Sequence, residues 1–497
     1  MKDQQLKKRP SAALSLMPLA ALIVMLTFTI RAFGSDSLSG ASQITLLTVS
    51  ALCVLIGMWR LHVPWQSFES AITKNVASVS SALFILLLIG ALSGAWMLSG
   101  VVPTLVYYGM HVIHPDIFLV SGCAICALVS VMTGSSWTTV ATIGIALMGI
   151  GRAQGFADGW VAGAIISGAY FGDKISPLSD TTTLASGSLG VPLFDHIRYM
   201  RRTTVPSVCI ALAVFAVAGL ASTTSSQEQI DTFNAALASR FCISPWLMLV
   251  PLLTGVLIAR RVPPIITLFA STLMAVAAAL VFQGQVLGEI DASPFRAAMK
   301  MLYAPTSLHA DNAMLANLVA TRGMGGMMDT IWLIICAMCF GATMSAAGMV
   351  GGITRLFIHM VRGRTSLVGA TAATGVVLNV AIADQYLCIL LTGNMFRDIY
   401  DREGYERRLL SRSVEDSVTV TSVLVPWNTC GMTQSTVLGV STLTYLPYCV
   451  FNWLSPLVSV AVAALAARQK RKITAKGALS CGKISNFATK TTEHSTN

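Results

Sequence analysis

A short polar stretch, from Ile166 to Val191, carries the groups of this chain that are best suited to bind a small cation. Its charged residues are Asp173, Lys174 and Asp180. Hydroxyl side chains accompany them, at Ser176, Ser179, Thr181, Thr182 and Thr183. Carboxylate and hydroxyl oxygens are the ligands that hard cations prefer. The stretch therefore predicts a site for a small hard cation or a proton, with Asp180 as the candidate sodium ligand.

The residues around these groups interrupt any helix. Gly172, Pro177, Gly187 and Gly190 all lie in or beside the polar stretch. Apolar segments flank the stretch on both sides, which predicts that it lies at membrane depth. Non-helical backbone is tolerated there only where protein or a water-filled cavity covers it. Charged groups at that depth are costly, and they usually persist because something binds there. We therefore expect interrupted helices to position the site.

The composition is that of a polytopic membrane protein of the all-α class. Of the 497 residues, 54% are hydrophobic and only 11% are charged, whereas soluble proteins carry about a quarter charged residues. The pattern predicts roughly 11 to 14 spans of about 20 residues each, some of them broken. The first span begins at Leu14–Ile30, and no small-residue cleavage pattern follows it. We therefore expect an uncleaved first helix.

The net charge of +11 is explained by orientation in a membrane rather than by binding to nucleic acid. The positive charges cluster in particular loops, as the positive-inside rule requires. The clusters expected to be cytoplasmic are Lys7–Arg9, Arg198–Arg202, Arg260–Arg261, Arg355–Arg364, Arg397–Arg412 and Arg468–Lys476. The segments expected outside are Ser35–Ser42, Ser222–Ala238 and Gly284–Asn312. Both termini are thus predicted to be cytoplasmic, in a bacterial inner membrane.

The chain contains similar stretches displaced by about 250 positions, as an internal repeat would produce. Ser93–Val102 aligns with Ser345–Thr354, and Pro177–Val191 aligns with Pro426–Val440. The charge pattern places the two copies in opposite orientations, which is typical of secondary transporters. The predicted division is 1–60 for N-terminal spans, 61–222 and 326–466 for two inverted repeats, 223–325 for connecting segments and 467–497 for a basic tail.

Further candidate residues lie in the second repeat and at one position of the first. Asp384 interrupts an apolar stretch, with Asn379 nearby. Asn428 and Thr429 follow Pro426 and correspond to the first polar motif. In the first repeat, Thr133 and Ser135 lie in the stretch that corresponds to the one around Asp384. We assign Asp180, Asp173, Ser179, Thr181, Asp384, Asn428 and Thr429 to ion binding, and Lys174, Ser176, Thr182, Asn379, Thr133 and Ser135 to tuning the site.

Several of these residues also have purely structural interpretations. Asp173 could form an internal salt bridge with Lys174, and hydroxyls such as that of Thr133 could serve helix packing. Glu415 and Asp416 are expected to pair with neighbouring arginines, namely Arg407, Arg408 or Arg412. In the binding interpretation, burial favours the neutral form of a carboxyl group. A buried carboxylate that holds either a proton or a sodium ion makes the two compete, and this competition is the basis of exchange.

The motif Gly172–Thr182 resembles the signature of NhaC-type sodium/proton antiporters, and Val425–Gly431 and the surroundings of Asn379 and Asp384 are similar as well. The resemblance extends over about Leu61–Ala466 and implies sodium/proton exchange and a role in pH homeostasis. Some relatives exchange sodium and lactate for malate and protons. The wider ion-transporter superfamily includes anion symporters with paired Ser-Asn-Thr motifs at re-entrant tips, which implies an elevator-like motion. Asp180 stands here where those motifs have Asn, which favours a cation.

Two other functions remain open at this point. An organic-anion exchanger of the malate/lactate type would need an arginine or a helix N-terminus facing the site, and no arginine lies in the motif. A more remote alternative is an intramembrane aspartyl protease, because Phe171-Gly172-Asp173 resembles part of a G-x-G-D motif with Asp384 as second acid. We expect a transporter rather than an enzyme, with no cofactor beyond the transported sodium and protons. The expected partners are small inorganic cations and the lipid bilayer, with no nucleic acid and with homo-oligomers possible.

Overall fold

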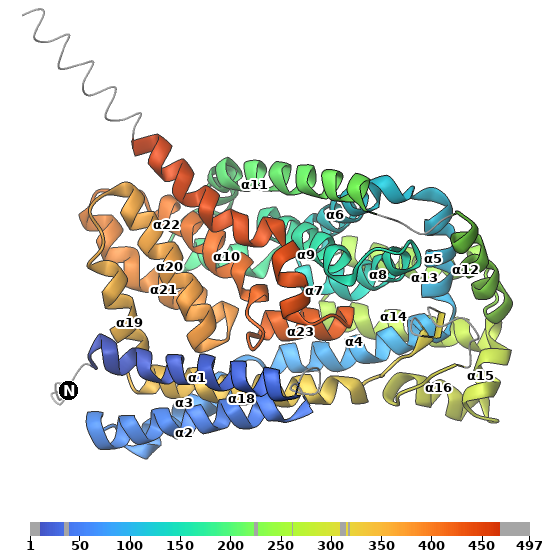
Figure 1. Cartoon of the computed structure of the whole chain (residues 1–497), viewed down its shortest axis with the longest axis horizontal. Coiled ribbons are helices and arrows are strands. Elements are labelled where there is room, and N and C mark those ends of the chain that lie inside the picture. Colours follow the sequence, from blue (N-terminus) through green and yellow to red (C-terminus); the bar gives the residue numbers. More distant parts are fainter. Residues whose placement is uncertain are drawn as a thin grey trace, which may run out of the picture.

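The computed structural model describes residues 10–33, 39–222, 227–260, 262–308, 315–316 and 319–467. Within these residues the chain is helical apart from connecting loops and one isolated antiparallel bridge between Thr306 and Thr321 (Figure 1). The basic segment Lys7–Arg9 and the predicted basic tail beyond Ala467 lie outside the described residues. The all-α prediction is confirmed.

The helices of the N-terminal half run from α1 to α13. They are α1 (Ala12–Phe33), α2 (Ala41–Leu61), α3 (Trp65–Ser78), α4 (Ser80–Leu98), α5 (Val101–Val112), α6 (Pro115–Thr133), α7 (Ser136–Thr139), the π-helical turn η2 (Val140–Gly144), α8 (Ile145–Ala153), α9 (Asp158–Ile175), α10 (Asp180–Ser188), α11 (Leu193–Ala221), α12 (Gln227–Arg240), η3 (Pro245–Met248) and α13 (Leu249–Ala259).

The C-terminal half has helices α18 to α20 with lengths similar to those of α4 to α6. Its elements are α14 (Pro264–Phe282), α15 (Gly284–Ile290), α16 (Pro294–Tyr303), η4 (Gly325–Met327), α18 (Met328–Ala346), α19 (Met349–Ile358), α20 (Arg364–Ile382), α21 (Gln385–Arg402), α22 (Arg407–Val414), the π-helical turn η5 (Glu415–Thr419), η6 (Ser422–Leu424), α23 (Thr429–Leu438), α24 (Thr442–Tyr445), η7 (Leu446–Tyr448) and a last helix, Val450–Ala467.

Among the described residues, nine helices are long and apolar enough to cross a membrane, or up to ten if the bent pair Ile230–Arg240 and Pro245–Ala259 is one span. The sequence predicts 11 to 14 spans because it also counts broken segments. Helices α9 and α21 have 18 residues each, but both carry several charged side chains. The difference in number thus reflects charged, interrupted helices rather than a different fold class.

Four interruptions divide helices in the middle of the protein. They separate α6 from α7, α9 from α10, α20 from α21, and η6 from α23. The first and third follow a residue in the left-handed region, Gly134 with φ 66° and Ala383 with φ 63°. The second and fourth contain a proline, Pro177 and Pro426, whose missing N–H cannot continue a helix. The expected interrupted helices are therefore present, two in each half, although Gly172 and Gly187 lie inside α9 and α10 and do not interrupt them.

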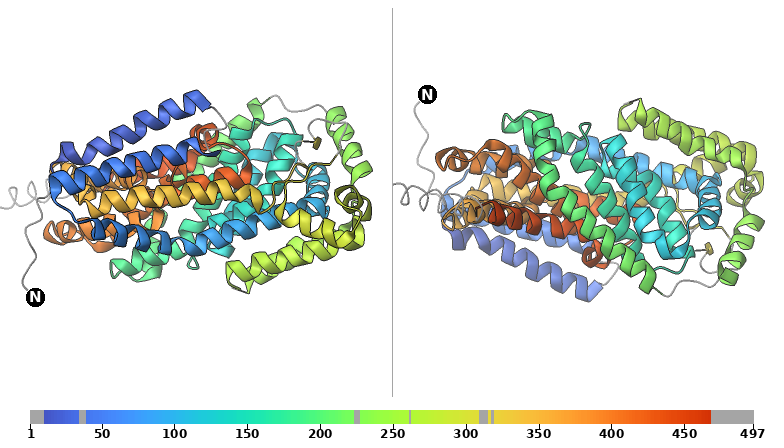
Figure 2. Two further views of the ribbon diagram at one scale, coloured as in Figure 1. Left: turned by 90° about the horizontal axis from the view of Figure 1, so that it is seen from below. Right: turned by 90° about the horizontal axis from the view of Figure 1, so that it is seen from above.

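The two halves run in opposite directions. In Figure 1, α4 runs from the end where the chain begins toward the opposite end, and α18 runs back. Helix α5, which follows α4, lies at the end opposite the start of the chain. Helix α19, which follows α18, lies at the same end as the start of the chain, and the other two views support this (Figure 2). This arrangement is what an inverted repeat would produce. The residue limits of the repeats stay a prediction.

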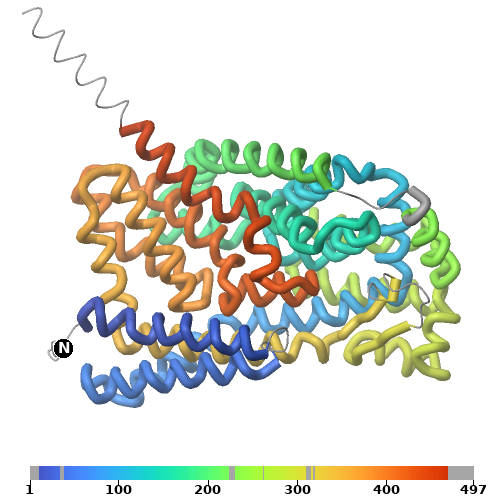
Figure 3. The backbone as a smooth tube through the Cα atoms, viewed as in Figure 1, coloured from blue at the N-terminus to red at the C-terminus, as the bar shows by residue number. Residues whose placement is uncertain are grey.

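Two hydrophobic clusters form the interior. Two of the helices that follow an interruption, α10 and α23, pack in the cluster formed mainly by the other half. One cluster gathers buried side chains from α4–α9 and α11–α16. The other gathers those of α1–α3 and α18–α22. Helix α10 nevertheless packs on α21, through Leu189 in the second cluster, and α23 packs on η2 with Cys430 in the first. The tube in Figure 3 shows the two halves interleaved in this way. This exchange brings the two halves together at the interruptions.

Gly172 sets the distance between α6 and α9, the most closely packed helix pair. A Cβ atom at Gly172 would stand 2.3 Å from the Ala127 carbonyl oxygen of α6. Gly172→Ala should therefore push α9 away and lower the free energy of unfolding by about 1–3 kcal/mol, measured by thermal unfolding in detergent. Gly187→Ala is the matched control, because nothing lies within 4 Å of its Cβ position. Equal stability of both variants would contradict this packing.

Candidate ion-binding site

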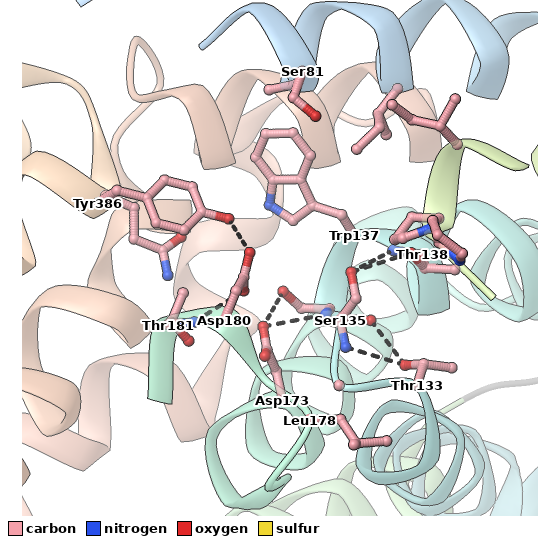
Figure 4. Close-up of a pocket in the computed structure, with 18 of the residues that line it drawn as sticks. Ser81, Thr133, Ser135, Trp137, Thr138, Asp173, Leu178, Asp180, Thr181 and Tyr386 are labelled. Atoms are coloured by element: carbon pink, nitrogen blue, oxygen red, sulfur yellow. Dashed lines mark hydrogen bonds between the residues drawn. The ribbon is translucent and has the colours of Figure 1, made fainter. Parts of the chain in front are cut away.

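The four interruptions meet at one cavity with a volume of about 690 Å³. One wall consists of the interruptions themselves. The other wall comes from the α3–α4 and α13–α14 junctions, including Val79, Ile85 and Ile265. Figure 4 shows the polar side chains that face this space. The cavity thus lies between the broken helices and the junctions of α3 with α4 and of α13 with α14.

Helix N-termini face the site, and hydroxyl, carboxylate or amide side chains cap them. Ser135 is the N-cap of α7, Ser179 that of α10, Asp384 that of α21 and Asn428 that of α23. The N-terminal end of a helix carries a partial positive charge, which stabilises an anionic side chain. Negative charge is supplied to α21 by Asp384 itself, to α10 by its first residue Asp180, and to α7 by Asp173. Without these carboxylates, the converging helix ends would repel a cation.

Asp173 keeps one carboxylate oxygen free of hydrogen bonds. Its Oδ2 accepts from the Ser136 hydroxyl at 2.7 Å and from the Ser136 backbone N–H at 3.2 Å. Its Oδ1 is buried and has no hydrogen-bond partner. An anionic oxygen buried without a donor is costly. A cation in the cavity, which Asp173 lines, would satisfy it.

Asp180 connects the two halves of the chain. Its Oδ1 accepts from the Thr181 backbone N–H at 2.9 Å, and its Oδ2 accepts from the Tyr386 hydroxyl at 2.6 Å. The side chain is exposed to the cavity. Thr181 and Thr429 line the same cavity. Figure 4 shows Tyr386 reaching Asp180 from α21. The two motifs, far apart in sequence, therefore share one site.

The second half contributes Asp384 and the α23 N-terminus. Asp384 Oδ1 accepts from the Leu387 backbone N–H at 2.8 Å, and the side chain is almost fully buried in the cavity wall. Asn428 accepts from the Cys430 backbone N–H at 3.1 Å and donates to the Asn379 carbonyl at 3.2 Å. Asn428 is fully buried and does not line the cavity. Asn428 therefore stabilises the backbone at the interruption between η6 and α23, while Thr429 beside it faces the cavity.

The residues assigned to tuning divide into two groups. Thr133 and Ser135 line the cavity. Ser176, Thr182 and Asn379 do not line it and instead bind backbone carbonyls of neighbouring segments. Their acceptors are Val131 at 2.8 Å, Lys174 at 3.1 Å and Val418 at 2.8 Å, respectively. Ser179 resembles this group, because its hydroxyl is buried against Thr181 and the Thr182 N–H. These residues fix the backbone around the site.

The salt bridge of Asp173 with Lys174, which the sequence leaves open as an alternative, does not form. Lys174 Nζ forms an ion pair with Asp416 and donates to the Ser455 hydroxyl at 2.9 Å, all in the fully buried interior. Asp416 also pairs with Arg412, at 3.5 Å between Oδ2 and Nε, as the sequence predicts. Glu415 does not share this pairing, because both of its carboxylate oxygens lack a hydrogen-bond partner. Neighbours on a helix point about 100° apart, which separates Asp173 from Lys174.

The cavity residues that were not assigned to the site from the sequence include Ser136, Trp137, Gln385 and Tyr386. These four lie one or two positions after Ser135 or Asp384, so the start of a new helix after the interruption was the available signal. No Lys, Arg or His belongs to the lining among the described residues. The cavity therefore combines three carboxylates with hydroxyl groups and two aromatic rings, without a side-chain cation.

Ala383 adopts a strained backbone conformation at the third interruption. Its φ of 63° is left-handed, like that of Gly134 at the matching place in the first half. Since a left-handed residue other than glycine costs roughly 1–2 kcal/mol, Ala383→Gly should raise thermal stability, measured by unfolding in detergent. The reciprocal change Gly134→Ala should lower it, because its Cβ would also stand 2.6 Å from the Leu178 backbone. An unstable Ala383→Gly variant would argue against the strain.

Comparison with known proteins adds a consistent result. A model of the Na+/H+ antiporter family matches residues 168–466. The chain is similar to the Na(+)/H(+) antiporter NhaC of Alkalihalophilus pseudofirmus, 37% identical over 84% of this chain and 89% of that protein. It is also similar to the Na(+)/H(+) antiporter NhaC of Bacillus subtilis, 34% identical over 80% and 87%. The malate-2H(+)/Na(+)-lactate antiporter of Bacillus subtilis is 35% identical over 83% and 86%.

Proposed function

The chain belongs to the Na+/H+ antiporter family, and we propose that it exchanges sodium ions for protons at the cavity formed by the four interrupted helices. It is a membrane-embedded secondary transporter. The observation that carries the proposal is the set of Asp173, Asp180 and Asp384 around one cavity whose described lining has no side-chain cation. Each carboxylate lies at a helix N-terminus that favours its charged form.

Sodium would be held by one or two of these carboxylates together with neutral oxygens. Among the described residues, no three His, Cys, Asp or Glu side chains converge as they would around a tightly bound transition metal. Hard cations bind readily to a mixture of carboxylate and neutral oxygens. Asp173 Oδ1 supplies an oxygen without a competing donor, and Thr181 and Thr429 supply hydroxyls in the same wall. A sodium ion between these groups would neutralise part of their negative charge.

The position of the cavity supports an alternating-access mechanism. The site lies where the interrupted helices face the α3–α4 and α13–α14 junctions. A movement of the interrupted helices along this wall would carry the site toward one side of the membrane or the other. Binding sites at the meeting point of inverted repeats are the rule for such transporters.

Exchange of malate and lactate is the second candidate, because one relative carries that name. An organic anion needs an arginine, a lysine or free helix N-termini at its site. Here carboxylates occupy the N-termini of α7, α10 and α21, and Asn428 caps α23. Anions would meet like charges in this cavity. The geometry thus favours the cation.

We further propose a bacterial inner membrane with both termini in the cytoplasm. The start of α1 and the end of the helix Val450–Ala467 lie at the same end of the protein (Figure 1). The segment joining α19 and α20, with its arginines, lies at that end too. Positive loops favour the cytoplasmic side. Homo-oligomer formation stays a prediction from the sequence.

The test is transport by the purified protein in proteoliposomes that contain a pH-sensitive dye. We expect an inward sodium gradient to drive protons outward, and malate or lactate gradients to have no effect in the absence of sodium. Protein-free liposomes prepared in parallel provide the background. A response to malate and lactate, together with none to sodium alone, would establish the second candidate instead.

A further inference from the structure

Glu415 is a buried acid for which the sodium cavity provides no role. It opens the π-helical turn η5 and is fully inaccessible to solvent. Both carboxyl oxygens lack a hydrogen-bond partner. The Thr419 hydroxyl approaches the group, but without hydrogen-bond geometry. A buried carboxyl group without donors is accommodated most easily in its neutral, protonated form. Wide π turns of this kind are often found at functional positions.

Glu415 lies between two sets of charged residues, those of the sodium cavity and those around the buried ion pair of Lys174 with Asp416. Asp173 of the cavity and the ion pair of Lys174 with Asp416 interact with it electrostatically. Arg412 of α22 contacts Asp416, and His196 of α11 interacts with both Asp416 and Lys174. Farther groups on the elements that pack against η5 are Asp180 of α10, Asp384 at the start of α21 and Arg364 of α20, which contacts Tyr199. Asp416 is already engaged by two bases, so Glu415 is the acid free to change its charge.

We propose that Glu415 is a proton-binding site separate from the sodium cavity, and that it carries the proton exchanged for sodium. The inference rests on the sodium/proton exchange proposed above and assigns its two ions to different carboxyl groups. The protonated Glu415 is neutral and leaves Asp173 undisturbed. When Glu415 loses its proton, its negative charge adds to the attraction that holds a cation at Asp173.

This arrangement would couple the two ions without a shared ligand. If ionised Glu415 strengthens sodium binding, thermodynamic linkage requires that bound sodium favours the ionised form by the same factor. Sodium entering the cavity would therefore release the proton from Glu415, and a proton arriving at Glu415 would release sodium. Antiport follows from the charge interaction across the interior, with Lys174 and Arg412 balancing the ionised state.

Glu415→Gln tests the separation of the two sites. Glutamine imitates the protonated side chain and cannot ionise, so the fold should keep its thermal stability. We expect sodium-driven proton movement in proteoliposomes to fall by about 100-fold or more, the scale for losing a group that transfers a proton. Exchange of radioactive sodium for unlabelled sodium, which needs no proton, should persist at saturating sodium, with the higher sodium requirement that the wild type shows when Glu415 is protonated, and its pH dependence should flatten.

Glu415→Asp is the matched control, since it keeps a carboxyl group and should retain proton coupling. Undiminished proton movement in Glu415→Gln would overturn the proposal. Parallel loss of both kinds of exchange in Glu415→Gln would overturn it too, because it would make Glu415 a structural group or a direct sodium ligand. A wild-type protein that exchanges sodium for sodium but moves no protons would instead contradict the proposed antiport itself.

Discussion

Asp173→Asn should abolish sodium-driven proton movement while leaving the fold intact. The amide oxygen can still accept the two hydrogen bonds from Ser136. Its NH2 group would then occupy the place of the unpartnered Oδ1, turning a cation ligand into a donor. At an effective dielectric constant of about 20, a full charge at about 4 Å contributes about 4 kcal/mol, so sodium affinity should fall by about 100- to 1,000-fold. Sodium titrations and dye-monitored exchange in proteoliposomes measure this loss.

Ser136→Ala is the matched control for Asp173→Asn. It removes the hydroxyl donor, keeps the backbone N–H and preserves the charge of Asp173. A hydrogen bond to a charged group contributes about 1.5–3 kcal/mol, so we expect a smaller loss than that caused by removing the charge. Wild-type exchange in a stable Asp173→Asn variant would show that Asp173 serves α7 alone and is no sodium ligand.

Local sequence rules predicted the parts of the site that depend on helix breaks. Pro177 and Gly134 interrupt their helices for reasons visible in the sequence, since proline lacks an N–H and glycine tolerates a left-handed backbone. Asp180 and Thr429 follow such breaks and do line the cavity. The polar residues Ser135, Ser179 and Asp384 cap the helices that start after these breaks, as their short oxygen-bearing side chains allow.

Tertiary partners were beyond such rules. Lys174 pairs with Asp416, 242 positions away, and only the packing of α9 against the second half decides this. The pairing of Asp416 with Arg412 is local, one helical turn apart, and the sequence predicted it. Glu415, next to Asp416, does not form the expected ion pair with an arginine. Asn379 and Ser176 look like ion ligands by type, yet their side chains satisfy backbone carbonyls at the interruptions.

The two halves of the site reach the same electrostatic result by different residues. In the first half, the α7 cap is the neutral Ser135, and the charge at this helix end comes from Asp173 on a neighbouring helix. In the second half, Asp384 is both the cap of α21 and the charge. In the first half, cap and charge can therefore be changed at separate residues, whereas at Asp384 only the choice of the replacing residue separates the two.

Asp384→Asn removes the charge and keeps the cap, because asparagine caps helices as well as aspartate does. We expect thermal stability like that of the wild type, and sodium affinity lowered by about tenfold or more, since each 1.4 kcal/mol of lost attraction is tenfold. Asp384→Ala loses both functions and should also lose about 1 kcal/mol of stability. Thermal unfolding and sodium titration of the two variants give the comparison.

The comparison distinguishes a binding role from a structural one. If Asp384 only starts α21, Asp384→Asn should behave like the wild type in every assay, and only Asp384→Ala should be impaired. If Asp384 attracts the transported ion, both variants should need more sodium, although only the alanine variant unfolds at lower temperature. The second outcome is expected, because Asp384 lines a cavity in which a cap alone would need no negative charge.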